Sequence, residues 1–158
     1  MKSLVEDLLK NLNEREIDVI KRRFGLGTEE KETLESIAKN FGITRERVRQ
    51  IQNNALNKLI KIINEKEKIT NFIENIKTFL EPLGFREENR FYKILIQEKV
   101  ISEDEISYLK FILTYHKKIY YHPEEDELRS FYSKEKDLAL FIKHILKKIN
   151  IYFLENYD

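Results

Sequence analysis

The sequence predicts a mainly α-helical protein: an N-terminal domain of four helices, then a helical module with one β-hairpin and a long C-terminal helix. Three observations predict this fold class. Apolar residues recur at helical spacing along most of the chain. Good N-cap residues, such as Asn13, Thr33 and Thr44, precede the apolar stripes. Four Gly and two Pro in 158 residues are too few for a many-turned β-sandwich or a Gly-rich phosphate loop.

The four N-terminal helices follow from their caps and stops. Asn13 with Glu16 three residues later predicts a capping box, and Gly25 ends the helix that follows it. Thr33 caps a third short helix, Gly42 supplies the next turn, and a second threonine begins a longer fourth helix. We therefore expect helices over residues 3–12, 14–24, 34–41 and 45 to about 64.

The second half continues with three helices and then a change of pattern. Ser102 with Glu105 forms a capping box before the third of these helices. Residues 119–122 and 128–132 resemble two short strands around an acidic turn, Glu124 to Glu127. Three helices and a hairpin are the order of a winged helix, which the long helix 134–154 would follow. The three helices are expected over residues 70–80, 88–99 and 102–115.

Charge and aromatic content divide the chain at the charged run from Asn64 to Lys68. Residues 1–68 carry a net charge of +3, and residues 69–158 carry −2. Only Phe24 and Phe41 of the 18 Phe and Tyr residues precede position 69. The sequence therefore predicts two domains with different cores, residues 1–66 and residues 69–158, and the basic first domain is the better candidate for a nucleic-acid partner.

Composition also excludes several classes of protein. Without cysteine there is no disulfide, no thiolate nucleophile and no Cys-ligated zinc site. Apolar stretches are too short for a membrane span, and no signal peptide is visible, so we expect a protein of the reducing cytoplasm. His116, His122 and His144 lack paired-ligand spacing. No nucleophile, base and orienting group can be assembled, so we expect no enzyme, no catalytic residue, no metal and no cofactor.

The third and fourth helices, joined by a glycine turn, predict a helix-turn-helix. In this motif the second helix enters the DNA major groove with its N-terminal residues at the base edges. At 100° per residue, Val48, Ile51, Ala55 and Leu59 form one apolar stripe of the fourth helix. The remaining faces carry Arg45, Glu46, Arg49, Gln50 and Asn53.

These free side chains fit the chemistry of base reading. Arginine suits guanine O6 and N7, glutamine suits adenine N6 and N7, and glutamate accepts from cytosine N4. The amides of the helix start at Thr44 suit a phosphate. An arginine cluster is also common on a solvated helix face, but the caps, the Gly42 turn and the apolar stripe agree with one another and favour DNA contact.

Three segments carry a specific resemblance: residues 12–27 (LNEREIDVIKRRFGLG), residues 33–51 (TLESIAKNFGITRERVRQI) and residues 55–59 (ALNKL). Over residues 3–61 the chain resembles region 4 of the sigma-70-family factors of bacterial RNA polymerase. In that family, region 4 reads the −35 promoter element in the major groove and grips the flap-tip helix of the polymerase β subunit.

The resemblance implies a role for each matching residue. Base readers would be Arg45, Glu46 and Gln50. Phosphates would be approached by Arg23, Thr33, Leu34, Thr44, Arg47 and Arg49. The flap-binding side would be formed by whatever remains exposed of Leu8, Leu9, Leu12, Ile17 and Ile20.

The chain also departs from the family pattern. The family usually has an acidic residue at Gln52 and basic residues at Asn54, Asn57 and Ile60. Fewer phosphate contacts would make binding weaker and less dependent on salt. Nothing resembles the region that melts the −10 element, so we do not expect a complete sigma factor.

The expected function is that of a sequence-specific transcription regulator that recognises a −35-like element. Its partners would be double-stranded DNA, the polymerase β flap and a second copy bound through residues 69–158. The alternative left open is a protein-interaction factor, of the anti-sigma or co-activator type, that occupies the β flap.

Overall fold

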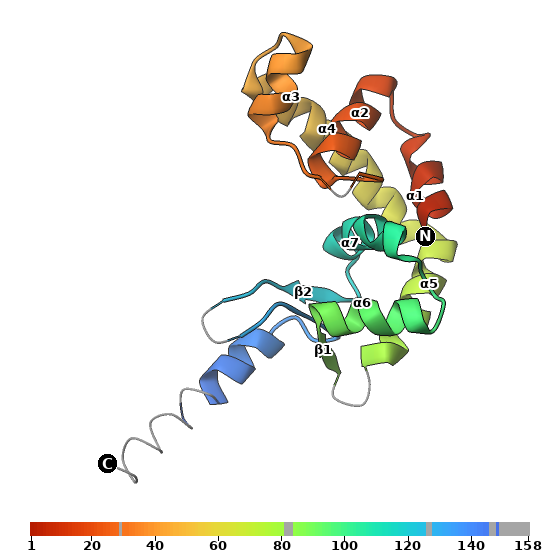
Figure 1. Cartoon of the computed structure of the whole chain (residues 1–158), viewed down its shortest axis with the longest axis vertical. Coiled ribbons are helices and arrows are strands. Elements are labelled where there is room, and N and C mark those ends of the chain that lie inside the picture. Colours follow the sequence, from red (N-terminus) through yellow and green to blue (C-terminus); the bar gives the residue numbers. More distant parts are fainter. Residues whose placement is uncertain (29, 81–83, 126–127, 146–147, 149–158) are drawn as a thin grey trace.

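The computed structural model describes residues 1–158 except 29, 81–83, 126–127, 146–147 and 149–158. Helices dominate, and a small sheet lies in the second half of the chain (Figure 1). The predicted fold class is therefore confirmed. No helix in the described ranges is both long enough and apolar enough to cross a membrane.

Three of the first four helices begin and end close to where their caps predict, whereas the first ends at Leu9, before the expected residue 12, and has no side-chain cap. The four helices are α1 (Lys2–Leu9), α2 (Glu14–Phe24), α3 (Leu34–Phe41) and α4 (Arg45–Glu65). Asn13 and Glu16 form a reciprocal capping box at the start of α2. Gly25 and Gly42 end α2 and α3 in the left-handed conformation, with φ of 63° and 62°. Local sequence therefore determines this part of the fold.

The second half has the order helix, strand, helix, helix, hairpin that is typical of a winged helix. Its helices are α5 (Glu67–Lys77), α6 (Glu88–Gln97) and α7 (Ile106–Tyr115), and its strands are β1 (Phe85–Glu87), β2 (Tyr120–His122) and β3 (Phe131–Ser133). Short 3-10 turns, Thr78–Leu80 and Glu103–Glu105, follow α5 and precede α7. The capping box of Ser102 and Glu105 belongs to the second turn.

The sheet has one strand more than the sequence predicted. Its order is β1-β3-β2, and both neighbouring pairs are antiparallel. Tyr132 in the central strand lies between Arg86 of β1 and Tyr121 of β2. A hairpin of two strands was expected, so the prediction was incomplete. Three residues are too few to show an alternating pattern, and β1 exists only because it pairs with β3.

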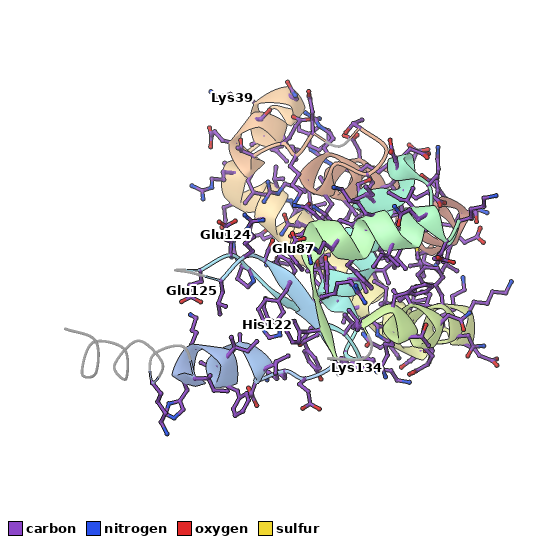
Figure 2. The ribbon with its side chains drawn as sticks, turned by 60° about the horizontal axis from the view of Figure 1, so that its bottom comes forward. Lys39, Glu87, His122, Glu124, Glu125 and Lys134 are labelled. Atoms are coloured by element: carbon purple, nitrogen blue, oxygen red, sulfur yellow. The ribbon has the colours of Figure 1, made fainter. Side chains whose placement is uncertain are left out.

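The predicted C-terminal helix, residues 134–154, begins later than expected. Residues 138–145 are helical, whereas 134–137 form a bend and a turn that connect them to β3. The predicted positions 146–147 and 149–154 lie outside the described residues. In Figures 1 and 2 the helix extends away from the helical body of the protein.

The prediction of two separate cores was wrong, because one apolar core runs through both halves. Side chains of α1 and α4, such as Leu8 and Leu59, belong to the same buried cluster as Phe91, Leu109 and Phe111 of the second half. The chain does break between α4 and α5 at Lys66, close to the predicted boundary. The two-domain division, residues 1–66 and 69–158, stays a prediction.

Helix α7 joins the halves, because it is buried on more than one side. Phe111 contacts Phe24 of α2 edge-on, with ring centroids 4.9 Å apart, and Tyr115 completes this aromatic group. Leu109 and Ile112 are fully buried. An amphipathic surface helix has one apolar face, whereas a helix with apolar residues all round is buried in a core. The five buried apolar residues between positions 108 and 113 of α7 span more than half of the helix circumference, so α7 packs on more than one side.

Polar contacts fix α7 against the first half at both of its ends. Asn64 of α4 donates to the Tyr115 carbonyl at 3.0 Å and accepts from the Lys117 amide at 3.2 Å. Before the other end of α7, Glu105 accepts hydrogen bonds from the Met1 amine and the Lys2 amide, both at 2.7 Å. Partial burial opposes ionisation of Glu105, but these bonds hold its pKa at about 2.

A continuous core predicts a single cooperative unfolding transition. Phe111→Ala is expected to cost about 3 to 5 kcal/mol, because it removes an aromatic ring from the contact between the halves. All eight tyrosines follow position 69, so tyrosine fluorescence reports only on the second half, whereas far-UV circular dichroism reports on helices in both. In urea, both signals of Phe111→Ala should change in one transition, with a midpoint at a lower urea concentration than in the unmodified protein.

The matched control is Thr114→Ala, on an exposed position of the same helix. It should shift the midpoint only slightly. Separate transitions for the two signals in the unmodified protein would contradict a shared core.

Candidate nucleic-acid interface

Helices α3 and α4 form a helix-turn-helix around Gly42. The turn needs a left-handed residue, which glycine adopts at little cost. Thr44 then begins α4 in extended conformation, and its hydroxyl accepts a hydrogen bond from the Arg47 amide at 3.2 Å. The first turn of α4, which carries the predicted base readers, is thereby fixed by its own cap.

A small apolar cluster, separate from the main core, holds α2, α3 and α4 together. It consists of Val19, Ile37, Ala38 and Val48, all buried, with Leu34, Phe41, Ile43 and Ile51 packed around them. Val48 is the only residue between positions 44 and 50 that is buried. The cluster therefore supports the start of α4 from beneath and leaves its other side chains on the surface.

A group of hydrogen bonds that the sequence did not predict joins α2 to the loop before α3. Arg22 donates to both carboxylate oxygens of Glu32 at 2.6 and 2.7 Å, and Ser36 donates to the same carboxylate at 2.8 Å. The bonds from Arg22 lower the pKa of Glu32 to about 2. Arg22 also lies over the ring of Phe41, 5.7 Å from its centroid. Arg22 is thus a structural arginine, in contrast to those of α4.

The three predicted base readers are exposed on the first two turns of α4 and differ in their partners. Within the described part of the chain, the Arg45 side chain has no hydrogen bond or ion pair. Glu46 accepts two bonds from Arg49, at 2.7 and 2.8 Å. These bonds lower the pKa of Glu46, which is a carboxylate acceptor at neutral pH. Gln50 accepts from Arg47 at 3.1 Å.

The predicted phosphate-contacting residues do not form one uniform group. Thr33 and Thr44 are exposed helix caps whose hydroxyl protons remain available to donate. Leu34 is the first residue of α3, where backbone amides lack helical acceptors. Arg47 and Arg49 are exposed on α4. Arg23 differs, because it is half-buried and bonded to other parts of the protein.

Arg23 connects α2 to α4 and to the loop before α3. Its Nε donates to Gln52 at 3.0 Å, and its Nη1 donates to the Glu32 carbonyl. At the position of Gln52, the family that the chain resembles usually has an acidic residue. A neutral amide there leaves the guanidinium charge of Arg23 less compensated than a carboxylate would.

Amide side chains continue the exposed face of α4 beyond Gln50. Asn53, Asn54 and Asn57 are exposed, and the first of these lies on the same side as Glu46, two turns later. Asparagine can donate and accept at once, as adenine reading requires, but it carries no charge for a phosphate. The continuation of the face therefore suits polar recognition more than charge neutralisation.

The apolar face predicted for the polymerase flap is not accessible. Leu8, Leu9, Leu12 and Ile20 are buried, and Ile17 packs against the same core. Helix α7 contacts α1 and α4 on this side and brings Phe111 against α2. The helix of the second module thus covers the face that the resemblance assigned to a partner.

The buried histidines belong to the structure of the second module. His122 Nε2 lies 2.8 Å from Ser133 Oγ, and its ring stacks on Phe131. Burial lowers the pKa of both His116 and His122. In the described ranges, no group of three or more His, Asp or Glu side chains is arranged to hold a metal ion.

Comparison with known proteins agrees with this geometry. Residues 8–61 match the family described as Sigma-70, region 4. The chain is 43% identical to RNA polymerase sigma factor SigA of a Bacillus species over 74 residues, which are 47% of this chain and 19% of SigA. It is 52% identical to RNA polymerase sigma factor RpoD of Helicobacter pylori over 60 residues, 37% of this chain and 9% of RpoD.

The resemblance predicted for residues 3–61 is thereby confirmed. The chain spans less than a fifth of the length of either sigma factor that it matches. The match covers α2, α3, most of α4 and the segments between them, and so includes every predicted base-reading and phosphate-contacting residue.

The cap of α4 gives a test of how the interface is held. Thr44→Ala removes the oxygen that accepts from the Arg47 amide and should cost about 1 kcal/mol of the free energy of unfolding. Thr44→Ser keeps that oxygen and should cost much less. Urea titrations of the two variants compare these losses. Equal destabilisation by both would show that the methyl group, not the cap, matters.

Proposed function

We propose that the chain is a sequence-specific DNA-binding protein of bacterial transcription that reads a −35-like promoter element through α4. The single observation that carries this proposal is the exposed start of α4, where Arg45, Glu46 and Gln50 are held on a supported and capped helix. The match of residues 8–61 to sigma-70 region 4 supports a DNA-binding role in transcription. A cytoplasmic location belongs to the same proposal.

Recognition would divide between base edges and phosphates. The exposed Arg45 guanidinium would donate to guanine, and the amide of Gln50 to adenine. The carboxylate of Glu46 would accept from cytosine. The Arg47 and Arg49 side chains would approach the backbone, where charge positions the helix without reading sequence. Arg23 and the starts of α3 and α4, at Thr33, Leu34 and Thr44, would add further backbone contacts.

The second module does not add a DNA-reading helix to this proposal. Its third helix, α7, is buried against the first half, with Phe111 and Leu109 inside the core. The tip of the hairpin carries Glu124 and Glu125, and acidic Asp126 and Glu127 follow in the sequence. Four carboxylates would repel a phosphate backbone. A second copy of the chain is the proposed partner for residues 69–158.

Selection from a random duplex pool, with the full chain as bait, tests the proposal. One enriched motif is expected. On the enriched duplex, Arg45→Ala or Gln50→Ala should lose about 1 to 3 kcal/mol of discrimination at one base pair. Arg47→Ala should instead weaken binding to all sequences and reduce the salt slope by about 0.9.

Arg90→Ala is the matched control, since it removes an exposed arginine from α6, away from the helix-turn-helix. It should change neither discrimination nor the salt slope by a comparable amount. A pool without enrichment, or equal losses on selected and scrambled duplexes for Arg45→Ala, would contradict base reading.

The alternative of a flap-binding factor finds less support in the structure. Its expected contact residues, including Leu8, Leu9 and Ile20, are fully buried against the protein's own core. A partner helix on that face would have to displace α7 and break the contacts of Asn64 and Glu105. Contact with RNA polymerase, which the family match makes plausible in general, would need another surface.

Titration with an isolated polymerase β flap domain separates the two functions. The full chain should show no binding under conditions in which it binds its selected duplex, while an isolated region 4 that grips the flap serves as the positive comparison. The physical reason is the cost of exposing the apolar contact of α7 with the first half. Flap binding that protects α1 from hydrogen exchange would overturn this expectation.

A further inference from the structure

The exposed face of α4 carries a row of polar side chains that continues beyond the predicted base readers. Glu46, Gln50, Asn53 and Asn57 follow one another at intervals of four, three and four residues. At 100° per residue they lie within about 60° of one another, on the side of the helix opposite the buried Val48. All four are exposed. Two amide side chains of this row, after Gln50, are therefore open to a partner.

Asparagine is an unfavourable residue in the middle of a helix, because its amide competes for backbone hydrogen bonds. Two other asparagines show this competition: Asn11 donates to the Leu8 carbonyl at 2.9 Å, and Asn64 donates to the Ile60 carbonyl at 2.8 Å. Within the described residues, the Asn53 side chain has no such bond and no other hydrogen bond to the protein. Residues that oppose the local structural preference are expected at functional sites.

The chemistry of an unbonded amide on a DNA-reading helix suits adenine. Its oxygen accepts from adenine N6 and its nitrogen donates to adenine N7, so that one side chain makes two bonds to one base edge. Homeodomains read adenine with an asparagine of the recognition helix, which shows that this side chain is long enough. Asn53 carries no charge with which to neutralise a phosphate. A base edge is therefore the part of a duplex that it fits best.

The position of Asn53 along α4 is also compatible with base reading. The base-reading residues of a homeodomain recognition helix span about two turns. Asn53 follows Glu46 by about two turns, whereas Asn57 follows it by about three. From Gln50 to Asn53 the helix advances by about 4.5 Å, and base pairs are spaced by about 3.4 Å. Asn53 would therefore meet the base pair next to the one that Gln50 meets.

We propose that Asn53 is a fourth base-reading residue of α4 and selects adenine at the base pair adjacent to the one read by Gln50. This inference rests on the proposed function, because it requires α4 to lie in the major groove. It lengthens the recognised element by one base pair on the Gln50 side. Because the contact involves no charged group, it adds specificity without adding to the salt dependence of binding.

Selection from a random duplex pool with the full chain, unmodified and as Asn53→Ala, tests this inference. The unmodified protein should enrich a motif with adenine next to the base pair that Gln50→Ala identifies. Asn53→Ala should enrich the same motif without that preference. On duplexes that differ only at this pair, the unmodified protein should prefer adenine by about 5- to 150-fold, and Asn53→Ala should bind them almost equally. Both proteins should show the same salt slope.

Asn54→Ala is the matched control, since Asn54 is an exposed asparagine of the same helix that lies about 100° further round, towards Arg47. It should keep the adenine preference. Asn53→Asp keeps the size of the side chain but removes its donor, so the preference should change from adenine to cytosine, whose N4 donates. Thermal unfolding monitored by circular dichroism checks the fold. Asn53→Ala should not lower the melting temperature, because alanine is the better helix former.

The outcomes separate failure of this proposal from failure of the proposed function. If the unmodified chain enriches a motif and Asn53→Ala enriches it with the same adenine preference, α4 reads DNA but Asn53 does not. Equal losses from Asn53→Ala and Asn54→Ala at every base pair would also overturn the proposal, because they would indicate a contact that reads no sequence. If the unmodified chain enriches no motif, the proposed function fails, and base reading by Asn53 fails with it.

Discussion

The burial of α7 is the constraint on which the rest of the structure depends. Phe111 and Leu109 are both buried, so the helix cannot be stable on the surface of either half alone. It belongs to the second half by sequence and to the core of both halves by packing. The first half supplies the other side of that core through Leu8, Phe24 and Leu59. The orientation of the winged module relative to the helix-turn-helix follows from this one helix.

The local parts of the fold could be predicted from the sequence because their causes are local. The side chains of the caps Asn13, Thr33 and Thr44 accept hydrogen bonds from amides three residues later. Gly42 has a left-handed φ of 62°, which favours glycine. The exposed side of α4 followed from helical periodicity, and Arg45 lies on it as predicted. The roles of Arg45, Glu46 and Gln50 toward DNA remain predictions.

Features that depend on distant residues could not be predicted in the same way. Strand β1 pairs with β3, more than forty residues later. The hydrogen bonds from Arg22 to Glu32 depend on how the loop before α3 folds back on α2. The shared core was hidden by the uneven distribution of aromatic residues, which suggested separate cores. The dense apolar segment around Phe111 was a usable signal, since such a helix needs burial on several sides.

The packing of α7 leaves the molecule with three separate surfaces. The face of α1 and α2 is closed by α7, the start of α4 is exposed and basic, and Leu140, Phe141 and Ile145 of the helix at 138–145 are exposed. The acidic hairpin tip belongs to the third surface, because Lys143 binds Glu125 there. In the field of a DNA duplex, a net charge of +3 on residues 1–68 and −2 on residues 69–158 would orient the molecule with α4 foremost. A partner bound at the third surface would leave α4 free, so its binding and DNA reading need not exclude each other.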